Sequence, residues 1–199
     1  MIIKILLVVV AYLLGAIPFG LVIARLQRGI DIREHGSGNI GTSNVLRTLG
    51  KRAALLTLAG DLIKGYLPVL IGSILGFPEP WIVLIGAAAV VGHNWPITIG
   101  FRGGKGVATS FGAALGIMPT IAVLALLVYL LVAAIARYTS LAALIGSASM
   151  LVWALVLKAS QPQVLFSAFA AGLIYLRHRE NIQRLILGTE RKIGQRVQV

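Results

Sequence analysis

The run PTIAVLALLVYLLVAAIA, residues Pro119–Ala136, is the clearest membrane-spanning pattern in the chain, because none of its side chains is charged. A straight helix needs about 20 predominantly apolar residues to cross the hydrocarbon core of a bilayer. Six more apolar runs can be drawn: Ile2–Leu26, Ala53–Leu75, Trp81–Ile99, Gly106–Met118, Leu141–Leu157 and Val164–Leu176. The sequence therefore predicts an all-α polytopic membrane protein with seven transmembrane helices.

The composition favours one membrane domain over residues 1–199. Hydrophobic residues make up 58% of the chain and charged residues 12%, whereas a soluble domain carries roughly 25% charged residues. The absence of cysteine excludes disulfides and thiolate metal ligands. We expect no metal and no cofactor, and we assign the net charge of +12 to membrane topology rather than to nucleic-acid binding.

Several helix boundaries follow from the lengths of the runs and from their prolines. The fourth and seventh runs, Gly106–Met118 and Val164–Leu176, are shorter than a straight span, so short helices are expected there. Pro18 predicts a kink in the first run. Met118 and Pro119 predict a tight hairpin that separates the fourth helix from the fifth.

The distribution of basic residues predicts the orientation. Of the 18 lysines and arginines, Lys64 lies inside the second run, and only Lys4 and Lys158 fall on one side of the bundle. The others lie on the opposite side, six of them in the tail: Arg177, Arg179, Arg184, Arg191, Lys192 and Arg196. The positive-inside rule then places the N-terminus outside and the C-terminus in the cytoplasm.

The segment HGSGNIGTSN, residues His35–Asn44, is a polar, glycine-rich loop on the cytoplasmic side. It has too little apolar surface for core burial to hold it, and its glycines and neutral polar side chains suit an anion. It contains G-x-G-x-x-G, but no strand precedes it, so a Rossmann site does not fit. Glycines for close helix packing are the simpler alternative, although they leave the neighbouring polar residues unexplained.

A second glycine-rich loop, GFRGGKG at Gly100–Gly106, precedes the fourth helix. It fails the Walker A pattern, yet it places Lys105 and several backbone amides at a helix start, where phosphate binds. Helices two, four and six would all begin on the cytoplasmic side, preceded by the first loop, by this loop and by Tyr138–Ser140. A loop that only sets topology is the alternative, and Arg102 alone would satisfy it.

Three further polar groups stand out. In RHRENI, residues Arg177–Ile182, His178 and Asn181 would share one face if the helix continues, whereas Arg179 and Arg184 are interpreted as a basic cluster next to the membrane. Asp61 and Lys64 are expected to form an ion pair inside the second helix. His93 ends the third helix on the cytoplasmic side.

The segments SGNIGTSN, GHNWPITIGFRGGKG and RHRENI, in this order and spacing, resemble the three cytoplasmic motifs of the bacterial acyl-phosphate-dependent glycerol-3-phosphate acyltransferases, the PlsY type. The resemblance covers the whole chain. Thr42-Ser43 stands where the family usually has Ala-Thr, which leaves open which hydroxyl contacts ligand. A transporter for a phosphorylated or other anionic solute is the competing interpretation, but the chain shows no inverted repeat and its polar motifs lie on one face.

The resemblance implies that an acyl phosphate, not acyl-CoA or acyl carrier protein, acylates the sn-1 hydroxyl of glycerol 3-phosphate. The products would be lysophosphatidic acid and inorganic phosphate, formed on the cytoplasmic face of the bacterial inner membrane. The other partners implied are membrane lipid and a transient soluble acyl-phosphate synthase. The candidate catalytic residues are Ser37, Lys105, His178 and Asn181, and the candidate substrate-binding residues are Gly38, Asn39, Gly41, Thr42, Asn44, Arg47, His93, Arg102, Gly103, Gly104, Gly106 and Ser140.

Overall fold

Each apolar run is largely helical in the computed structural model, which describes residues 1–195; Arg196, counted with the basic tail, lies outside that range. No strand occurs among the described residues. The α-helices are α1 (Ile2–Gly15), α2 (Phe19–Arg28), α3 (Thr42–Leu49), α4 (Lys51–Ile74), α5 (Glu79–Asn94), α6 (Val107–Ile117), α7 (Pro119–Ala136), α8 (Thr139–Val156), α9 (Gln161–Arg177) and α10 (Arg179–Ile186). Short 3-10 turns cover Ile32–Glu34 and Ile97–Ile99.

Five helical segments are long and apolar enough to cross a membrane: Ile2–Arg28, Lys51–Ile74, Glu79–Ile99, Pro119–Ala136 and Thr139–Val156. The helix in the fourth run, α6, has only 11 residues, and α9 in the seventh has 17. Large apolar side chains such as Leu127 and Ile135 are exposed along α7. The helices thus present an apolar outer surface, as expected for an integral membrane protein.

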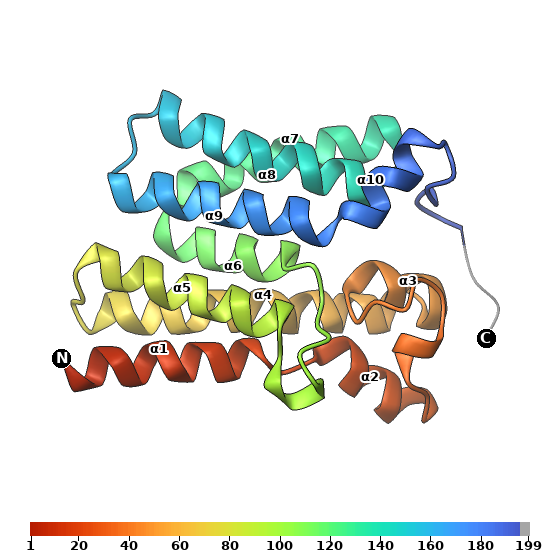
Figure 1. Cartoon of the computed structure of the whole chain (residues 1–199), viewed down its shortest axis with the longest axis horizontal. Coiled ribbons are helices and arrows are strands. Elements are labelled where there is room, and N and C mark those ends of the chain that lie inside the picture. Colours follow the sequence, from red (N-terminus) through yellow and green to blue (C-terminus); the bar gives the residue numbers. More distant parts are fainter. Residues whose placement is uncertain (196–199) are drawn as a thin grey trace.

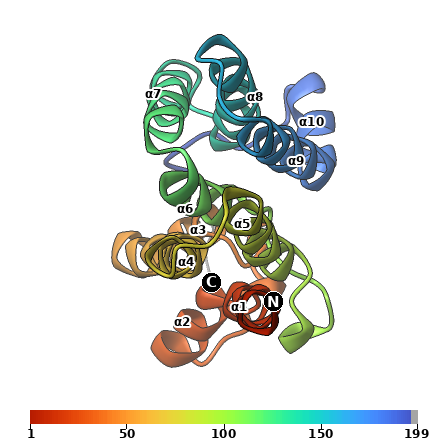
Figure 2. The ribbon, with the colours of Figure 1, turned by 90° about the vertical axis from the view of Figure 1, so that its left-hand side faces the viewer.

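The long helices lie roughly side by side, with α2, α3 and α10 gathered at the end opposite the N-terminus (Figure 1). Seen along the long axis of the molecule in Figure 2, α1, α2, α4 and α5 form one group and α7, α8, α9 and α10 form another. Helix α6 lies between the groups and contacts α4, α5, α7 and α9. The three polar segments found in the sequence therefore meet at one end of the molecule.

The first run breaks at Pro18, as predicted, so that α1 ends at Gly15 and α2 begins at Phe19. A break inside an apolar run exposes backbone carbonyls that water cannot reach. Here Thr98 donates to the Ala16 carbonyl at 2.6 Å, and the Lys64 ammonium donates to the Ile17 carbonyl at 2.7 Å. The predicted hairpin is also confirmed, since α6 ends at Ile117 and α7 begins at Pro119.

One prediction about the polar segments was wrong, and a condition attached to another is not met. The His35–Asn44 loop does not lead directly into the second long helix, because the short helix α3 intervenes and α4 begins only at Lys51. The last long helix does not continue through RHRENI; it ends at Arg177, and α10 starts at Arg179 in a new direction. Each change of direction brings a polar segment back over the end of the bundle.

Glycines allow the closest helix crossings. A β-carbon at Gly112 of α6 would lie 2.1 Å from the Leu62 carbonyl oxygen of α4, and one at Gly65 of α4 would lie 2.2 Å from the Thr109 carbonyl oxygen of α6. Such small residues let backbones approach where apolar side chains gain little from leaving lipid. The α4–α6 contact therefore depends on glycine from both sides.

Replacement of Gly112 by alanine is expected to force α4 and α6 apart and to destabilise the protein by about 1–3 kcal/mol, the usual cost of overpacking. Gly172→Ala in α9 is the matched control, because a β-carbon there would meet nothing within 4 Å. Thermal unfolding in detergent measures both. An unchanged melting temperature for Gly112→Ala would contradict this account of the crossing.

Candidate active site

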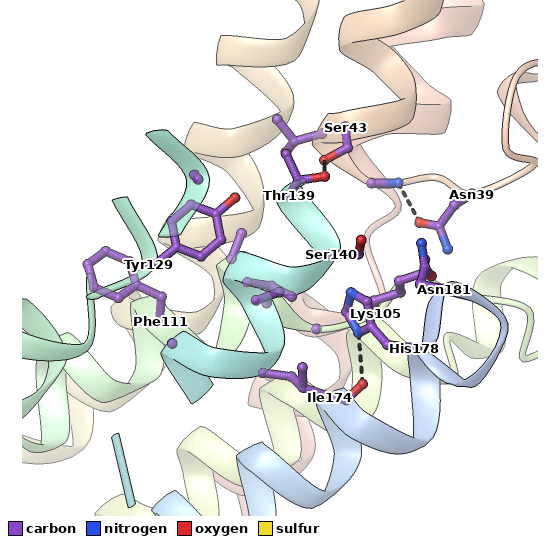
Figure 3. Close-up of a pocket in the computed structure, with 18 of the residues that line it drawn as sticks. Asn39, Ser43, Lys105, Phe111, Tyr129, Thr139, Ser140, Ile174, His178 and Asn181 are labelled. Atoms are coloured by element: carbon purple, nitrogen blue, oxygen red, sulfur yellow. Dashed lines mark hydrogen bonds between the residues drawn. The ribbon is translucent and has the colours of Figure 1, made fainter. Parts of the chain in front are cut away.

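A cavity of about 840 Å³ opens where the polar segments meet the long helices. Its polar end is formed by the His35–Asn44 loop, Lys105 and the residues around His178. Its apolar end lies between α4, α6, α7 and α8 and is lined by Leu62, Phe111, Leu126, Tyr129, Ala143 and Met150. The two ends are visible in Figure 3, with Lys105, His178 and Asn181 at one side and Phe111 and Tyr129 at the other.

The polar end brings together three helix starts, two of them as the sequence predicts; the third is that of α3 rather than of the second long helix, α4. Thr42 and Ser43 at the start of α3, Val107 at the start of α6, and Ser140 in the first turn of α8 all line the cavity. The first N–H groups of a helix have no partner within it, and with the helix dipole they favour anions. The hydroxyl of Ser43 also lies 3.4 Å from that of Thr139 and joins α3 to α8.

The His35–Asn44 loop is held by Asn44 and by two buried isoleucines. The Asn44 amide oxygen accepts from the Ser37 N–H at 2.7 Å, and its nitrogen donates to the carbonyls of Ile32, His35 and Asn39. Ile32 and Ile40 are buried in a small core with α2 and α3. The expectation that core burial could not hold this loop was therefore wrong. The side chain of Asn44 uses its hydrogen bonds to hold the backbone of the loop.

The second glycine loop is clamped from two sides. Arg177 donates from Nη2 to the Gly103 carbonyl at 2.9 Å and from Nε to the Gly104 carbonyl at 3.0 Å. A β-carbon at Gly104 would lie 2.0 Å from His93 Nε2. Both glycines are buried and neither lines the cavity. Close packing, rather than contact of their amides with ligand, therefore explains why they are glycines.

A buried ion pair lies next to the second glycine loop. Lys64 Nζ lies 2.7 Å from Asp61 Oδ1, which confirms the predicted pair, and His93 Nδ1 lies 3.5 Å from the same oxygen. Asp61 and His93 both line the cavity. Since His93 also packs against Gly104, the ion pair is connected to the loop that carries Lys105.

Four basic side chains line the polar end: Arg47, Lys105, Arg184 and Arg191. Burial lowers the pKa of Lys105 to about 8, and the positive charge of Arg184 contributes in the same direction. Burial also lowers the pKa of Arg47, although Glu190 opposes the shift. Arg191 is exposed and Arg184 pairs with Glu190, but the partial burial of Arg47 and Lys105 is unfavourable unless an anion lies near them.

His178 is neutral near pH 7. Burial, followed by the charge of Lys105, lowers its pKa to about 4. Its Nδ1 lies 2.8 Å from the Ile174 carbonyl oxygen, which can only accept, so Nδ1 carries the proton of the neutral ring. Nε2 is then left as an acceptor for a substrate hydroxyl.

The cavity brings together most of the predicted site residues: Ser37, Asn39, Gly41, Thr42, Asn44, Arg47, His93, Lys105, Gly106, Ser140, His178 and Asn181. It does not include Gly38, Arg102, Gly103 or Gly104; Arg102 is exposed, and Gly38 takes a left-handed turn with φ +70°. The hydroxyls of Thr42 and Ser110 are buried without a protein hydrogen-bond partner among the described residues and border the cavity.

Arg184 and Glu190 are two of the polar cavity residues that sequence reasoning missed. Arg184 was interpreted as a membrane-surface residue, but its Nε donates to Glu190 Oε2 at 2.7 Å beside the cavity. Glu190 lies in the tail, where no motif marked it. The third-motif arginine Arg179, in contrast, is exposed as expected.

Comparison with known proteins identifies the family. The family model described as glycerol-3-phosphate acyltransferase matches residues 5–188. The chain belongs to the glycerol-3-phosphate acyltransferase family. A glycerol-3-phosphate acyltransferase of Clostridioides difficile (strain 630) is 46% identical, with 96% of each chain covered. One of Thioalkalivibrio sulfidiphilus (strain HL-EbGR7) is 47% identical, with 94% of this chain and 93% of the relative covered.

A solved structure shares the fold. The crystal structure of PlsY (YgiH), an integral membrane glycerol 3-phosphate acyltransferase, in its glycerol 3-phosphate form superposes with a TM-score of 0.92 at 40% identity, covering 96% of both chains. Its lysophosphatidic acid form gives a TM-score of 0.89 at 39% identity. The chain is therefore an acyltransferase and an integral membrane protein, and the transporter alternative is set aside.

The acyltransferase is expected to lose kcat/KM for glycerol 3-phosphate as pH rises through about 8, because Lys105 loses its proton there. Arginine stays charged throughout the accessible range, so Lys105→Arg should move this alkaline limb upward even if turnover is lower. A pH–rate profile of both proteins measures the shift. If the alkaline limb lay at the same pH in the wild type and in Lys105→Arg, Lys105 would not be the titrating group.

Proposed function

We propose that the acyltransferase uses an acyl phosphate as donor and acylates the sn-1 hydroxyl of glycerol 3-phosphate. The carbonyl carbon of the donor forms a bond to the glycerol oxygen, and its bond to the phosphate oxygen breaks. Lysophosphatidic acid and inorganic phosphate are the products. One observation carries the proposal: a single cavity joins a strongly cationic end to an apolar chamber.

The cationic end suits two phosphorylated substrates. Both the donor and the acceptor carry phosphate, and Arg47, Lys105 and the helix starts offer charge and N–H groups for both. As the acyl–phosphate bond breaks, negative charge grows on the departing phosphate, and fixed cations stabilise it. Because phosphate is already a good leaving group, the reaction needs no nucleophilic side chain.

His178 positions the acceptor hydroxyl in this scheme. With Nδ1 bound to the Ile174 carbonyl, Nε2 accepts a hydrogen bond from the sn-1 hydroxyl. A histidine whose pKa is about 4 is a weak base near pH 7. The proton therefore passes to an oxygen of a substrate phosphate, while His178 and Asn181 orient the hydroxyl.

The acyl chain would occupy the apolar chamber. Leu58 of α4 and Leu130 of α7 line the cavity and are 39% and 51% exposed, so the chamber opens sideways between these helices. In a membrane this opening faces lipid. An acyl phosphate could then enter from the bilayer with its head already at the depth of Lys105.

The donor proposal is tested with purified protein in a lipidic medium, labelled glycerol 3-phosphate and one of three donors: acyl phosphate, acyl-CoA or acyl carrier protein thioester. Only acyl phosphate should give lysophosphatidic acid, with one phosphate released per molecule formed. Lys105→Ala serves as the background control. Comparable product from a thioester, or phosphate release without lysophosphatidic acid, would contradict the proposal.

We also propose seven membrane spans, with α6 and α9 as the short ones, an external N-terminus and a cytoplasmic C-terminus in the bacterial inner membrane. The active site would face the cytoplasm, where a soluble acyl-phosphate synthase could dock transiently. The asymmetry of basic residues supports this orientation. A reporter fused to the C-terminus should be active only in the cytoplasm, and periplasmic activity would overturn the topology.

A further inference from the structure

Glu190 closes a chain of hydrogen bonds that begins at Lys105. The Lys105 ammonium donates to the Asn181 amide oxygen, and the Asn181 nitrogen donates to Glu190 Oε1 at 2.7 Å. Ser140 donates to the same carboxylate oxygen at 2.9 Å, and Arg184 Nε donates to the other at 2.7 Å. The carboxylate therefore joins α8, α10 and the tail next to the cavity.

The conformation of the tail places Glu190 in this position. Helix α10 ends at Ile186, and Gly188 adopts a left-handed φ of +69°. The N–H groups of Thr189 and Glu190 then both donate to the Arg184 carbonyl, at 2.8 and 3.1 Å. The Glu190 side chain is 5% exposed although it follows an exposed turn. The match to the family model ends at residue 188, before this carboxylate.

The buried carboxylate is ionised. Burial raises the pKa of Glu190, but the hydrogen bonds from Arg184, Asn181 and Ser140 outweigh burial and leave the pKa below its ordinary value. A carboxylate can only accept, and the Lys105 ammonium can only donate. Asn181 lies between them, so its nitrogen must face Glu190 and its oxygen must face Lys105.

This arrangement matters most when substrate binds. If Lys105 turns toward a phosphate, the Asn181 amide loses one of its two hydrogen-bond partners. Without the other partner, Glu190, the amide would be free to rotate about χ2. Glu190 still holds the nitrogen, so the oxygen stays directed toward Lys105 and the acceptor. Because the Asn181 amide is already oriented, little free energy is needed to reorganise it during the reaction.

We propose that Glu190 is a positioning residue for acyl transfer: its carboxylate orients the Asn181 amide and, through it, Lys105. Glu190 does not itself touch the reacting atoms. The inference rests on the family's acyl transfer to glycerol 3-phosphate.

The charges around Lys105 provide a second readout. Arg47 of α3 and Arg184 of α10 favour its neutral form, whereas Glu180 of α10 and Glu190 favour its charged form; His178 beside it is neutral. Loss of Glu190 removes both a negative charge and the contact to Asn181. Glu180 offers a matched control, because its side chain is 74% exposed, lies 3.9 Å from Arg184 and has no hydrogen bond to Asn181 among those of the described residues.

The test compares Glu190→Gln, Glu190→Asp and Glu180→Gln with the wild type. Each is measured for kcat, for KM with glycerol 3-phosphate, for its pH–rate profile with acyl phosphate as donor, and for its melting temperature. We expect Glu190→Gln to lower kcat roughly tenfold or more, the size expected when a reacting group is misplaced, and to move the alkaline limb to lower pH. Glu180→Gln should stay within about twofold, as for an exposed ion pair.

Glu190→Asp separates the effect of the carboxylate charge on Lys105 from that of the hydrogen bond with Asn181. It keeps the carboxylate but is one methylene shorter, so we expect an alkaline limb near that of the wild type and a reduced kcat. If Glu190→Gln fails to fold, this variant decides. Equal kcat for Glu190→Asp and the wild type would overturn the proposal.

Two other results with Glu190→Gln would also overturn it. A kcat matching that of Glu180→Gln would mean that Glu190 only stabilises the tail. An unchanged kcat with a lower KM for glycerol 3-phosphate would mean that Glu190 competes with the substrate phosphate. An inactive wild type would instead contradict the acyl-phosphate donor, so the two failures are distinguishable.

Discussion

Polar groups that are removed from water must find partners within the protein, and this constraint determines the arrangement at the polar end of the bundle. The carbonyls freed by the break at Pro18 are satisfied by Thr98 and Lys64. The carbonyls of the second glycine loop are satisfied by Arg177. Leaving such a group unpaired costs about 1–3 kcal/mol, so the position of each loop is tied to a particular polar side chain.

The same constraint explains the contrast between the two kinds of polar residue at the site. Asn44 directs its hydrogen bonds to backbone groups of the first loop, and Arg177 of α9 directs its hydrogen bonds to the carbonyls of the second glycine loop, so that each fixes the shape of a loop. Arg47, Lys105 and the buried hydroxyls of Thr42 and Ser110 border the cavity instead. A phosphorylated ligand offers the acceptors that these donors need, and the apolar chamber beyond them accepts a chain without any polar contact.

Much of the fold and site could be predicted from local sequence. The apolar runs define the long helices, Pro18 and Pro119 mark real breaks, and most of the candidate site residues line one cavity. Predictions failed where tertiary contacts decide. Gly103 and Gly104 suggested contact with phosphate, whereas in the structure they pack against His93 and bind Arg177 through their carbonyls. Arg177 lies 74 residues after Gly103, so the local sequence does not reveal this contact. Glu190 follows no pattern, because only the turn at Gly188 directs it back to Asn181.

The central claim is that one cavity holds the phosphate head and the acyl chain of the donor. A structure of the protein with a non-hydrolysable acyl phosphonate tests it directly. The account predicts the phosphonate beside Lys105 and Arg47, with the chain running between α4 and α7 past Phe111 and Tyr129. A chain lying instead in the groove between α5 and α9, against Phe166 and Phe169, would contradict it.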